Sequence, residues 1–341
     1  MNYLEAGVNV ELGNELVKQL GPLLRGTFDK NVIDNFGSYS ALYDISKVPV
    51  KNPVLSLSVD GVGSKINLAI KYNKLDGLGQ DLVAMVMNDI ICCGAQPLMF
   101  LDYYAANHLS LENSLRVIKG VVTACETINV SFIGGETAEM PLTYNKNDFD
   151  LAGLGVGIVD KEKIINPDLL TVGDVIIGLG SSGPHSNGFA LINELDANNF
   201  NLTVEERRIL IHESLVPTRL YVNTILKLIE HIDVKGIAHI TGGGLTENLP
   251  RIFPDHLSPY LDMSWPTPEI FNIIRRHSTM TSEDMLRTYN MGVGMVVIVS
   301  HDELLETLDC LHDCNETVYV IGTVIKNTNY SGVVYGKGVM S

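Results

Sequence analysis

The chain has 341 residues, of which 45% are hydrophobic and 19% charged, a composition typical of folded rather than disordered proteins. This length is too great for one ordinary hydrophobic core and predicts two domains. Acidic residues outnumber basic ones, 40 to 24, and the formal net charge is −16. Because such a chain repels phosphate backbones and contains no basic run, we expect no nucleic-acid partner.

The cysteines and the N-terminal sequence indicate the compartment. Cys92 and Cys93 are adjacent, Cys310 and Cys314 lie four apart, and neither spacing is that of a disulfide framework or a zinc site. Reduced thiols of this kind suit a reducing compartment. The N-terminus lacks the regions of a signal peptide, and the apolar runs are far shorter than a membrane span. We therefore expect a cytoplasmic protein with no membrane contact.

Strand-like and helix-like patterns alternate along the whole chain, which favours an α/β fold with mixed α+β layers. In the first half the patterns predict strands at 54–59, 130–133 and 151–159 and helices at 81–93 and 110–128. In the second half they predict strands at 174–179, 236–238, 294–299 and 318–325 and helices at 204–212, 219–231, 268–277 and 302–312. The polar segment 161–173 is the predicted boundary, which gives domains 1–165 and 166–341.

The first buried strand ends in the segment 60–65, Asp-Gly-Val-Gly-Ser-Lys. Proteins of the α/β class usually place their ligands at the carboxyl ends of strands. Gly61 and Gly63 would let backbone N–H groups approach an anion, and Lys65 would add a positive charge. The spacing is not that of a Walker A loop. An ordinary exit from a strand, with Asp60 as a cap, explains the segment equally well.

The helix predicted at 81–93 carries three polar side chains in an apolar context. At about 100° per residue, Asp81 and Asn88 lie within roughly 20° of each other, and Asp89 lies about 80° from Asp81. Such a stripe is costly to bury unless something binds it, and carboxylate oxygens are ligands that Mg²⁺ prefers. A solvated helix face is the alternative, but the apolar neighbours favour a metal.

Two glycines follow the strand predicted at 130–133 and precede Glu136 and Thr137. They allow close backbone approach to a ligand, while Glu136 offers another carboxylate and Thr137 a hydroxyl. A turn before a helix, with Thr137 and Glu139 as capping residues, fits the segment as well.

The second half contains two further polar loops. Residues 178–183 match Gly-x-Gly-x-x-Gly after a strand, but the loop continues as Pro-His-Ser-Asn-Gly instead of entering an apolar helix, which argues against a Rossmann fold. We interpret 181–188 as a loop that binds an anion or substrate, with His185 as acid, base or donor. His239 shortly precedes three glycines at 242–244, which indicate unusual dihedral angles or close ligand contact. A lone histidine is nevertheless more often structural than catalytic.

Taken in order, these motifs resemble the phosphoribosylformylglycinamidine cyclo-ligase family, the aminoimidazole ribonucleotide synthetases, nearly end to end. The motifs are Tyr-Leu-Glu-Ala-Gly-Val-Asn-Val (3–10), Asp-Gly-Val-Gly-Ser-Lys (60–65), Asp-Leu-Val-Ala-Met with Asn-Asp (81–89), Gly-Ala-Gln-Pro-Leu-Met-Phe-Leu-Asp-Tyr-Tyr (94–104), Gly-Gly-Glu-Thr-Ala-Glu-Met-Pro (134–141), Gly-Ser-Ser-Gly-Pro-His-Ser-Asn-Gly (180–188), Val-Pro-Thr-Arg-Leu-Tyr (216–221), Ala-His-Ile-Thr-Gly-Gly-Gly (238–244) and Tyr-Asn-Met-Gly-Val-Gly-Met (289–295). Ser64 replaces a threonine that is common in the family, and both residues carry a hydroxyl.

The resemblance implies a two-domain fold of the aminoimidazole-ribonucleotide-synthetase type, and a homodimer that pairs through the sheet of the N-terminal domain. It implies that ATP and Mg²⁺ convert formylglycinamidine ribonucleotide into aminoimidazole ribonucleotide, ADP and phosphate in purine biosynthesis. Phosphorylation of the amide oxygen gives an iminophosphate, from which phosphate leaves when a substrate nitrogen closes the ring. Such a reaction requires positioning and charge neutralisation more than covalent chemistry.

The resemblance also implies roles for individual residues. Those implied for Mg²⁺ are Asp60, Asp89 and Glu136. Those implied for ATP and its phosphates are Gly61, Gly63, Ser64, Lys65, Asp81, Asn88 and Thr137. Those implied for the nucleotide substrate are Ser181, Ser182, Gly183, His185, Ser186, Asn187, Thr241, Gly242 and Gly243. His185, His239 and Lys65 are the candidate catalytic residues. Two alternatives are a small-molecule kinase of the same superfamily and a silent binding protein on the same fold.

Overall fold

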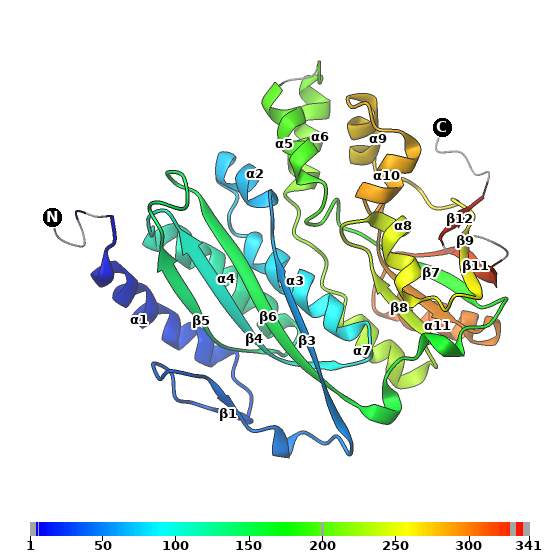
Figure 1. Cartoon of the computed structure of the whole chain (residues 1–341), viewed down its shortest axis with the longest axis horizontal. Helices are drawn as coiled ribbons and strands as arrows, with labels where there is room; N and C mark the ends of the chain where they lie inside the picture. Colours follow the sequence, from blue (N-terminus) through cyan, green and yellow to red (C-terminus); the bar gives the residue numbers. More distant parts are fainter. Residues whose placement is uncertain (1–4, 6, 199–200, 328–331, 337–341) are drawn as a thin grey trace. The chain divides into compact units, whose positions relative to one another are not determined.

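The computed structural model describes residue 5 and residues 7–198, 201–327 and 332–336. The chain divides into two compact units, of which one comprises Met1–Ile90 with Ala95–Glu162 and the other Ile91–Gly94 with Lys163–Ser341. Each unit is a sheet with helices packed on it (Figure 1), so the expected mixed layers of helix and sheet are confirmed. Among the described residues, no helix has both the length and the apolar character needed to cross a membrane.

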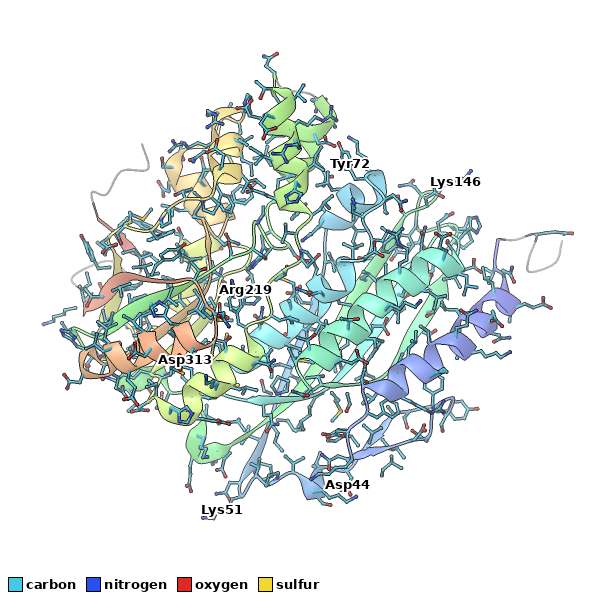
Figure 2. The ribbon with its side chains drawn as sticks, turned by 180° about the vertical axis from the view of Figure 1, so that it is seen from behind. Asp44, Lys51, Tyr72, Lys146, Arg219 and Asp313 are labelled. Carbon is cyan, nitrogen blue, oxygen red and sulfur yellow. The ribbon has the colours of Figure 1, made fainter. Side chains whose placement is uncertain are left out.

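The first unit is built on a four-stranded sheet with the order β3-β6-β4-β5. Its strands are β3 (Pro53–Gly61), β6 (Phe149–Asp160), β4 (Gln96–Ala106) and β5 (Ser131–Glu139). Only the β4–β5 pair is parallel. Its other elements are α1 (Val10–Gly26), β1 (Val32–Ile33), β2 (Leu42–Tyr43), the 3-10 turn η1 (Ile45–Lys47), α2 (Lys65–Lys71), α3 (Leu78–Ile91) and α4 (Leu111–Thr127). Figure 2 shows this unit from the side that α3 and α4 cover.

Glycines in β6 let α3 approach the sheet closely. A Cβ atom on Gly155 would lie 2.6 Å from Val86, and one on Gly157 would lie 2.5 Å from Ile90. Side chains at both positions would therefore force the helix outward. This packing explains why the strand predicted at 151–159 is interrupted by glycines.

The opposite face of this sheet carries apolar side chains that the described chain does not cover. Leu55, Leu57 and Val59 alternate along β3 and are 49%, 63% and 68% exposed. Residues at every second position of a strand point to the same face. We call these three side chains the open face.

The second unit is built on a six-stranded sheet with the order β12-β9-β11-β7-β10-β8. Its strands are β12 (Val334–Tyr335), β9 (Leu257–Leu261), β11 (Val318–Lys326), β7 (Val175–Gly180), β10 (Val293–Val299) and β8 (Gly236–His239). Its helices are α5 (Phe189–Asn198), α6 (Val204–Ser214), α7 (Val222–His231), α8 (Gly244–Asn248), α9 (Glu269–Arg276), α10 (Ser282–Thr288) and α11 (Leu304–Asp313). Four further 3-10 turns follow β6 along the chain: η2 (Lys161–Lys163), η3 (Pro167–Leu169), η4 (Leu249–Ile252) and η5 (His301–Glu303). Every residue of β7 and β10 is buried, so these two strands form the centre of the core.

The structure corrects several predicted elements. The strand predicted at 130–133 continues through both glycines to Glu139, so the alternative of a turn and a helix start is wrong. The helix predicted at 219–231 begins only at Val222. Neither α1 nor β4 was predicted. The buried leucines of α1 follow the helical period at Leu16, Leu20 and Leu24, a signal that was available in the sequence.

Candidate functional site

The segment after β3 forms a tight turn into α2. Gly63 has a φ of 67°, and Ser64 is the residue before the helix, which begins at Lys65. The Lys65 side chain is 1% exposed, and its Nζ donates a hydrogen bond of 2.8 Å to Oδ1 of Asp81 in α3. Burial lowers the pKa of Lys65, although the Asp81 carboxylate opposes that change. Two residues that were both assigned to ATP therefore form an internal ion pair.

The polar stripe of α3 is divided between interior and surface. Asp81 and Asn88 are both 0% exposed, so the alternative of a solvated helix face is wrong for them. Asp89 is exposed. The carboxylates of one helix therefore have different surroundings, and only Asp89 is open to solvent.

The structure does not gather the three predicted Mg²⁺ ligands in one place. Asp60 is opposite Gly153, which packs on Leu82, so Asp89 lies seven residues or about 10 Å farther along α3. Glu136 lies three strands from Gly61, in the row that also contains Ala152 and Tyr103. This row faces away from Asp60, because neighbouring residues of a strand point to opposite faces. Among the described residues no three His, Cys, Asp or Glu side chains form a metal-binding group.

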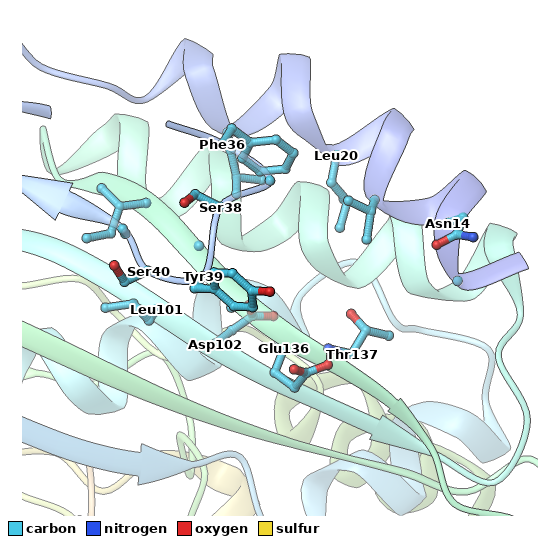
Figure 3. A pocket seen from close by; sticks show the side chains of 18 of the residues that line it. Asn14, Leu20, Phe36, Ser38, Tyr39, Ser40, Leu101, Asp102, Glu136 and Thr137 are labelled. Carbon is cyan, nitrogen blue, oxygen red and sulfur yellow. Dashed lines mark hydrogen bonds between the residues drawn. The ribbon is translucent and has the colours of Figure 1, made fainter. Parts of the chain in front are cut away.

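A cavity of about 690 Å³ lies between α1, the segment 35–41 and the strands β4 and β5. Figure 3 shows Asp102, Glu136 and Thr137 on these strands, with Leu20 and Phe36 on the other side. Glu136 and Thr137 are predicted site residues, so the structure places two of them at one cavity. Three carboxyl groups line it, those of Asp102, Glu136 and Glu139, and no lysine, arginine or histidine is among its lining residues.

Asp102 is a residue of this cavity that the sequence analysis did not single out. Burial raises its pKa to about 7, a bond from its own backbone N–H opposes the rise, and the charge of Glu136 adds to it. The carboxyl group leans over Gly135, where a Cβ atom would collide with Oδ1. A single acid in the apolar run from Leu98 to Tyr104 was the signal that could have identified it.

Glu139 of β5 fixes the N-terminal end of α1 to the sheet. Its two oxygens accept hydrogen bonds from the backbone N–H groups of Asn9, at 2.5 Å, and Leu109, at 2.8 Å. Asn9 is the N-cap of α1, so Glu139 does take part in capping a helix. The helix is α1, which is distant in sequence, and not one that starts beside Glu139. One wall of the cavity is therefore fixed by a carboxylate that the backbone satisfies.

In the second unit, the loop that follows β7 is held by internal hydrogen bonds. The ring of His185 is 1% exposed, and its Nε2 accepts a hydrogen bond of 3.1 Å from the Ser182 N–H. His185 also has a φ of 59°, a left-handed conformation that is uncommon for a residue other than glycine. Because Nε2 accepts, this nitrogen carries no proton in the observed arrangement. The geometry shows His185 organising the loop, and its predicted role in proton movement stays a prediction.

Other side chains position the same loop and bring it to the glycines after β8. Asn290 donates to the Gly183 carbonyl at 2.8 Å, and its Oδ1 accepts from Ser181 at 3.2 Å. A Cβ atom on Gly242 would lie 3.4 Å from Oδ1 of Asn187, so two predicted substrate segments do meet. Asn290 was not predicted as a site residue, although it lies within a motif that carries the resemblance.

The glycines at 242–244 are required by the backbone. Gly243 and Gly244 have φ values of 97° and 56°, and a Cβ atom on Gly244 would collide with a backbone oxygen. The expectation of unusual dihedral angles is confirmed. His239 is 5% exposed at the end of β8, where it is paired with Met295 of β10.

Comparison with known proteins identifies the family. Residues 39–159 match the family model described as AIR synthase related protein, N-terminal domain, and residues 171–335 match its C-terminal counterpart. The chain is 43% identical over 332 residues to a phosphoribosylformylglycinamidine cyclo-ligase of Caldanaerobacter subterraneus, covering 96% of this chain and 98% of that protein. It is 45% identical over 327 residues to the enzyme of the same name from Burkholderia pseudomallei, covering 95% and 93%.

The chain belongs to the phosphoribosylformylglycinamidine cyclo-ligase family. Solved structures with lower identity share the fold of this family. The hydrogenase maturation protein HypE of E. coli has a TM-score of 0.68 at 16% identity, covering 93% of this chain and 92% of that one. A HypE structure in complex with ATP has a TM-score of 0.66 at 17% identity, covering 92% and 86%. The fold and family expected from the motifs are therefore confirmed.

Proposed function

We propose that the chain catalyses the ATP-dependent closure of formylglycinamidine ribonucleotide to aminoimidazole ribonucleotide, with release of ADP and phosphate. The observation that carries the proposal is the identity of 43% to 45% with enzymes of the cyclo-ligase name over nearly the whole chain. Every motif acid named above is present in this sequence. The same proposal includes a cytoplasmic location and a place in purine biosynthesis.

Residues of the first unit are proposed to bind the nucleotide. The backbone of Gly61 and Gly63 and the hydroxyl of Ser64 would contact phosphates at the end of β3, and Thr137 would contact the nucleotide at the cavity. Because Lys65 and Asp81 pair with each other, we propose that they fix the turn between β3 and α2 instead of meeting the phosphates. A turn held in this way would present its backbone N–H groups in one geometry.

Mg²⁺ fits the chemistry of the proposed ligands, because Asp60, Asp89 and Glu136 offer only hard carboxylate oxygens. Among the described residues these three carboxylates lie apart and do not form one group. Mg²⁺ usually retains waters and binds phosphates with one or two carboxylates, so a full set is not required. Once bound, the ion would neutralise charge on the phosphates.

A homodimer through the N-terminal sheet is part of the proposal. Leu55, Leu57 and Val59 form an apolar surface that a second copy of the sheet would cover. Glu136 also points to this side of the sheet, so pairing would bring it toward the partner subunit. Measurement of molecular mass in solution for the native chain and for Leu57→Glu tests this point, with loss of the dimer expected in the variant.

In the second unit, the loop 181–188 and the glycines 242–244 are proposed to bind the substrate. Their contact through Asn187 and Gly242 supports one common site. The hydrogen bonds to Asn290 and Ser182 would hold the loop ready before the substrate arrives. His239 and His185 remain the proposed groups for proton movement.

The reaction is tested by following free phosphate and diazotisable aminoimidazole together, with formylglycinamidine ribonucleotide and Mg-ATP. Equal amounts of both products from the native chain, and loss of both in Asp60→Asn and Asp89→Ala, are expected. Glu126→Gln, which changes an exposed acid of α4, serves as the matched control. Transfer of the γ-phosphate to a stable product would instead indicate a small-molecule kinase and contradict the proposal.

A further inference from the structure

Asn248 is a buried polar residue close to the glycines at 242–244. It is the last residue of α8 and is 3% exposed. A buried amide destabilises a fold unless its donors and its acceptor are hydrogen-bonded. Asparagine is also a poor helix former, because its side chain competes for backbone hydrogen bonds. A side chain at this position is therefore expected to have specific partners.

The Asn248 side chain binds the backbone of the loop that precedes α8. Its Nδ2 donates to the carbonyl oxygens of Thr241 at 3.3 Å, Gly242 at 3.2 Å and Gly244 at 2.8 Å. Its Oδ1 accepts from the Thr241 hydroxyl at 3.4 Å. It makes no capping bond to the turn η4 that follows. The amide group is thus engaged with the loop 241–244.

These hydrogen bonds set the direction of the loop's peptide groups. A peptide unit is planar and trans, so its N–H points away from its carbonyl oxygen. With the carbonyls of Thr241 and Gly242 turned toward Asn248, the N–H groups of Gly242 and Gly243 point the other way. Gly242 is exposed and Gly243 half-buried. Within the described part of the chain, no acceptor takes a hydrogen bond from either N–H group.

The helix that carries Asn248 is itself held by its neighbours. A Cβ atom on Gly244 would lie 2.1 Å from the carbonyl oxygen of Leu286, so the backbones of α8 and α10 approach closely. The Thr246 hydroxyl donates to the same carbonyl at 3.3 Å and lies 2.8 Å from the Tyr335 hydroxyl of β12. Asn248 therefore extends to the loop from a fixed element.

The neighbouring loop 181–188 is held by the same kind of side chain. Asn290 is 1% exposed. Its Nδ2 donates to the Gly183 carbonyl at 2.8 Å, and its Oδ1 accepts from the backbone N–H of Gly292 at 2.9 Å. Each loop of the proposed substrate site thus has one buried asparagine that binds its backbone.

We infer that Asn248 is a positioning residue of the proposed substrate site. It holds the carbonyl groups of the loop 241–244 inward, so that the N–H groups of Gly242 and Gly243 face the formylglycinamidine ribonucleotide. The inference rests on the proposed function. Donors that are already oriented lose little freedom when a ligand binds, so a loop held in this way binds its substrate more tightly than a mobile one.

The variant Asn248→Ser separates the loop from the helix. A serine hydroxyl in a helix bonds to the carbonyl four residues earlier, here that of Gly244, and is too short to reach Thr241 and Gly242. We expect the KM for formylglycinamidine ribonucleotide to rise by about 10-fold, with kcat and the KM for ATP within about threefold of the native values, because uniform binding of one substrate is lost. Asn248→Ala should give the same rise in KM with a larger loss of stability.

Thr307→Ala is the matched control. Thr307 is 0% exposed in α11, and its hydroxyl donates to the carbonyl four residues earlier at 2.8 Å. Its loss should lower stability and leave both KM values unchanged. An Asn248→Ser chain that is folded by circular dichroism and has a substrate KM within about twofold of the native value would overturn the inference. An equal rise in Thr307→Ala would overturn it as well, because a general loss of stability would then explain the effect.

Hydrogen exchange tests the loop without the reaction. The Gly244 N–H donates to the Thr241 carbonyl at 3.0 Å. Its exchange should become about tenfold faster in Asn248→Ser and stay unchanged in Thr307→Ala. Unchanged exchange in Asn248→Ser would overturn the inference whatever the KM values. Faster exchange in the variant, with no aminoimidazole formed by the native chain, would contradict the proposed reaction and still support the positioning of the loop by Asn248.

Discussion

Two acids of the first unit, Asp81 and Asp102, lie away from bulk solvent but differ in what neutralises them. Asp81 faces the ammonium group of Lys65 at 2.8 Å, with both side chains 1% exposed. Asp102 has no cationic partner among the described residues, and it lines a cavity. A buried charge that is paired joins two helices, whereas an acid without a cation takes up a proton and remains available to a ligand. The comparison separates a structural acid from a candidate binding acid.

The largest expected effect comes from removing the ion pair between Lys65 and Asp81. Lys65→Met leaves the Asp81 carboxylate buried without its lysine and should lower the free energy of unfolding by about 3–5 kcal/mol. Urea unfolding at pH 7 measures the loss. The double variant Lys65→Met, Asp81→Leu should recover most of it, because no charge then remains. A loss below about 1 kcal/mol in the single variant would show that the pair has no structural role.

The next effect concerns the space beside Asp102. Gly135→Ala places a methyl group against Oδ1 of Asp102 and the backbone of β4, and should cost about 2–3 kcal/mol of unfolding free energy. Gly134→Ala is the matched control, because a Cβ atom there meets nothing within 4 Å. Thermal unfolding of both variants measures the difference. Equal stability of the two would contradict the described placement of the carboxyl group.

Asp102, which has no cationic partner among the described residues, should make the free energy of unfolding depend on pH. The pKa of Asp102 in the folded chain, about 7, lies above its ordinary value of 3.8, so its burial costs stability progressively from about pH 4 to pH 7 and by a constant amount above. Asp102→Asn removes this cost. The gain in unfolding free energy over the native chain should grow by about 2 kcal/mol between pH 5 and pH 8, after allowance for solvent in the cavity. A gain that does not change with pH would show that Asp102 is ionised throughout.

The smallest effect tests a third carboxyl group of the first unit, that of Glu139, whose partners are backbone N–H groups. Glu139 accepts from the backbone N–H groups of Asn9 and Leu109, so Glu139→Gln weakens two bonds to a charged acceptor and should cost about 1 kcal/mol. Hydrogen exchange of the Asn9 amide gives a local measure, and exchange should become faster. Glu126→Gln, which is exposed on α4, should change neither value.

Much of the fold was accessible from the sequence, because long periodic segments report which side is buried. The helix predicted at 110–128 is α4, and Ser110 accepts from the Asn113 N–H at its start as the capping pattern requires. The central strand β4 was missed because it is apolar without regular alternation, and a run of this kind does not distinguish strand from helix. The helix that was predicted to begin at Arg219 begins three residues later, at Val222, because helix ends depend on local contacts.

The sequence alone determined the family, the mixed layers of helix and sheet, and the segments that carry polar residues at strand ends. Only the tertiary structure decided which of those residues meet. Strand register placed Glu136 on the opposite face of the sheet from Asp60, and the packing of α2 on α3 paired Lys65 with Asp81. The local pattern fixes the type of element and its buried side, whereas register and helix packing join residues distant in sequence. The physical roles of Asp81 and Asp102 differ for that reason.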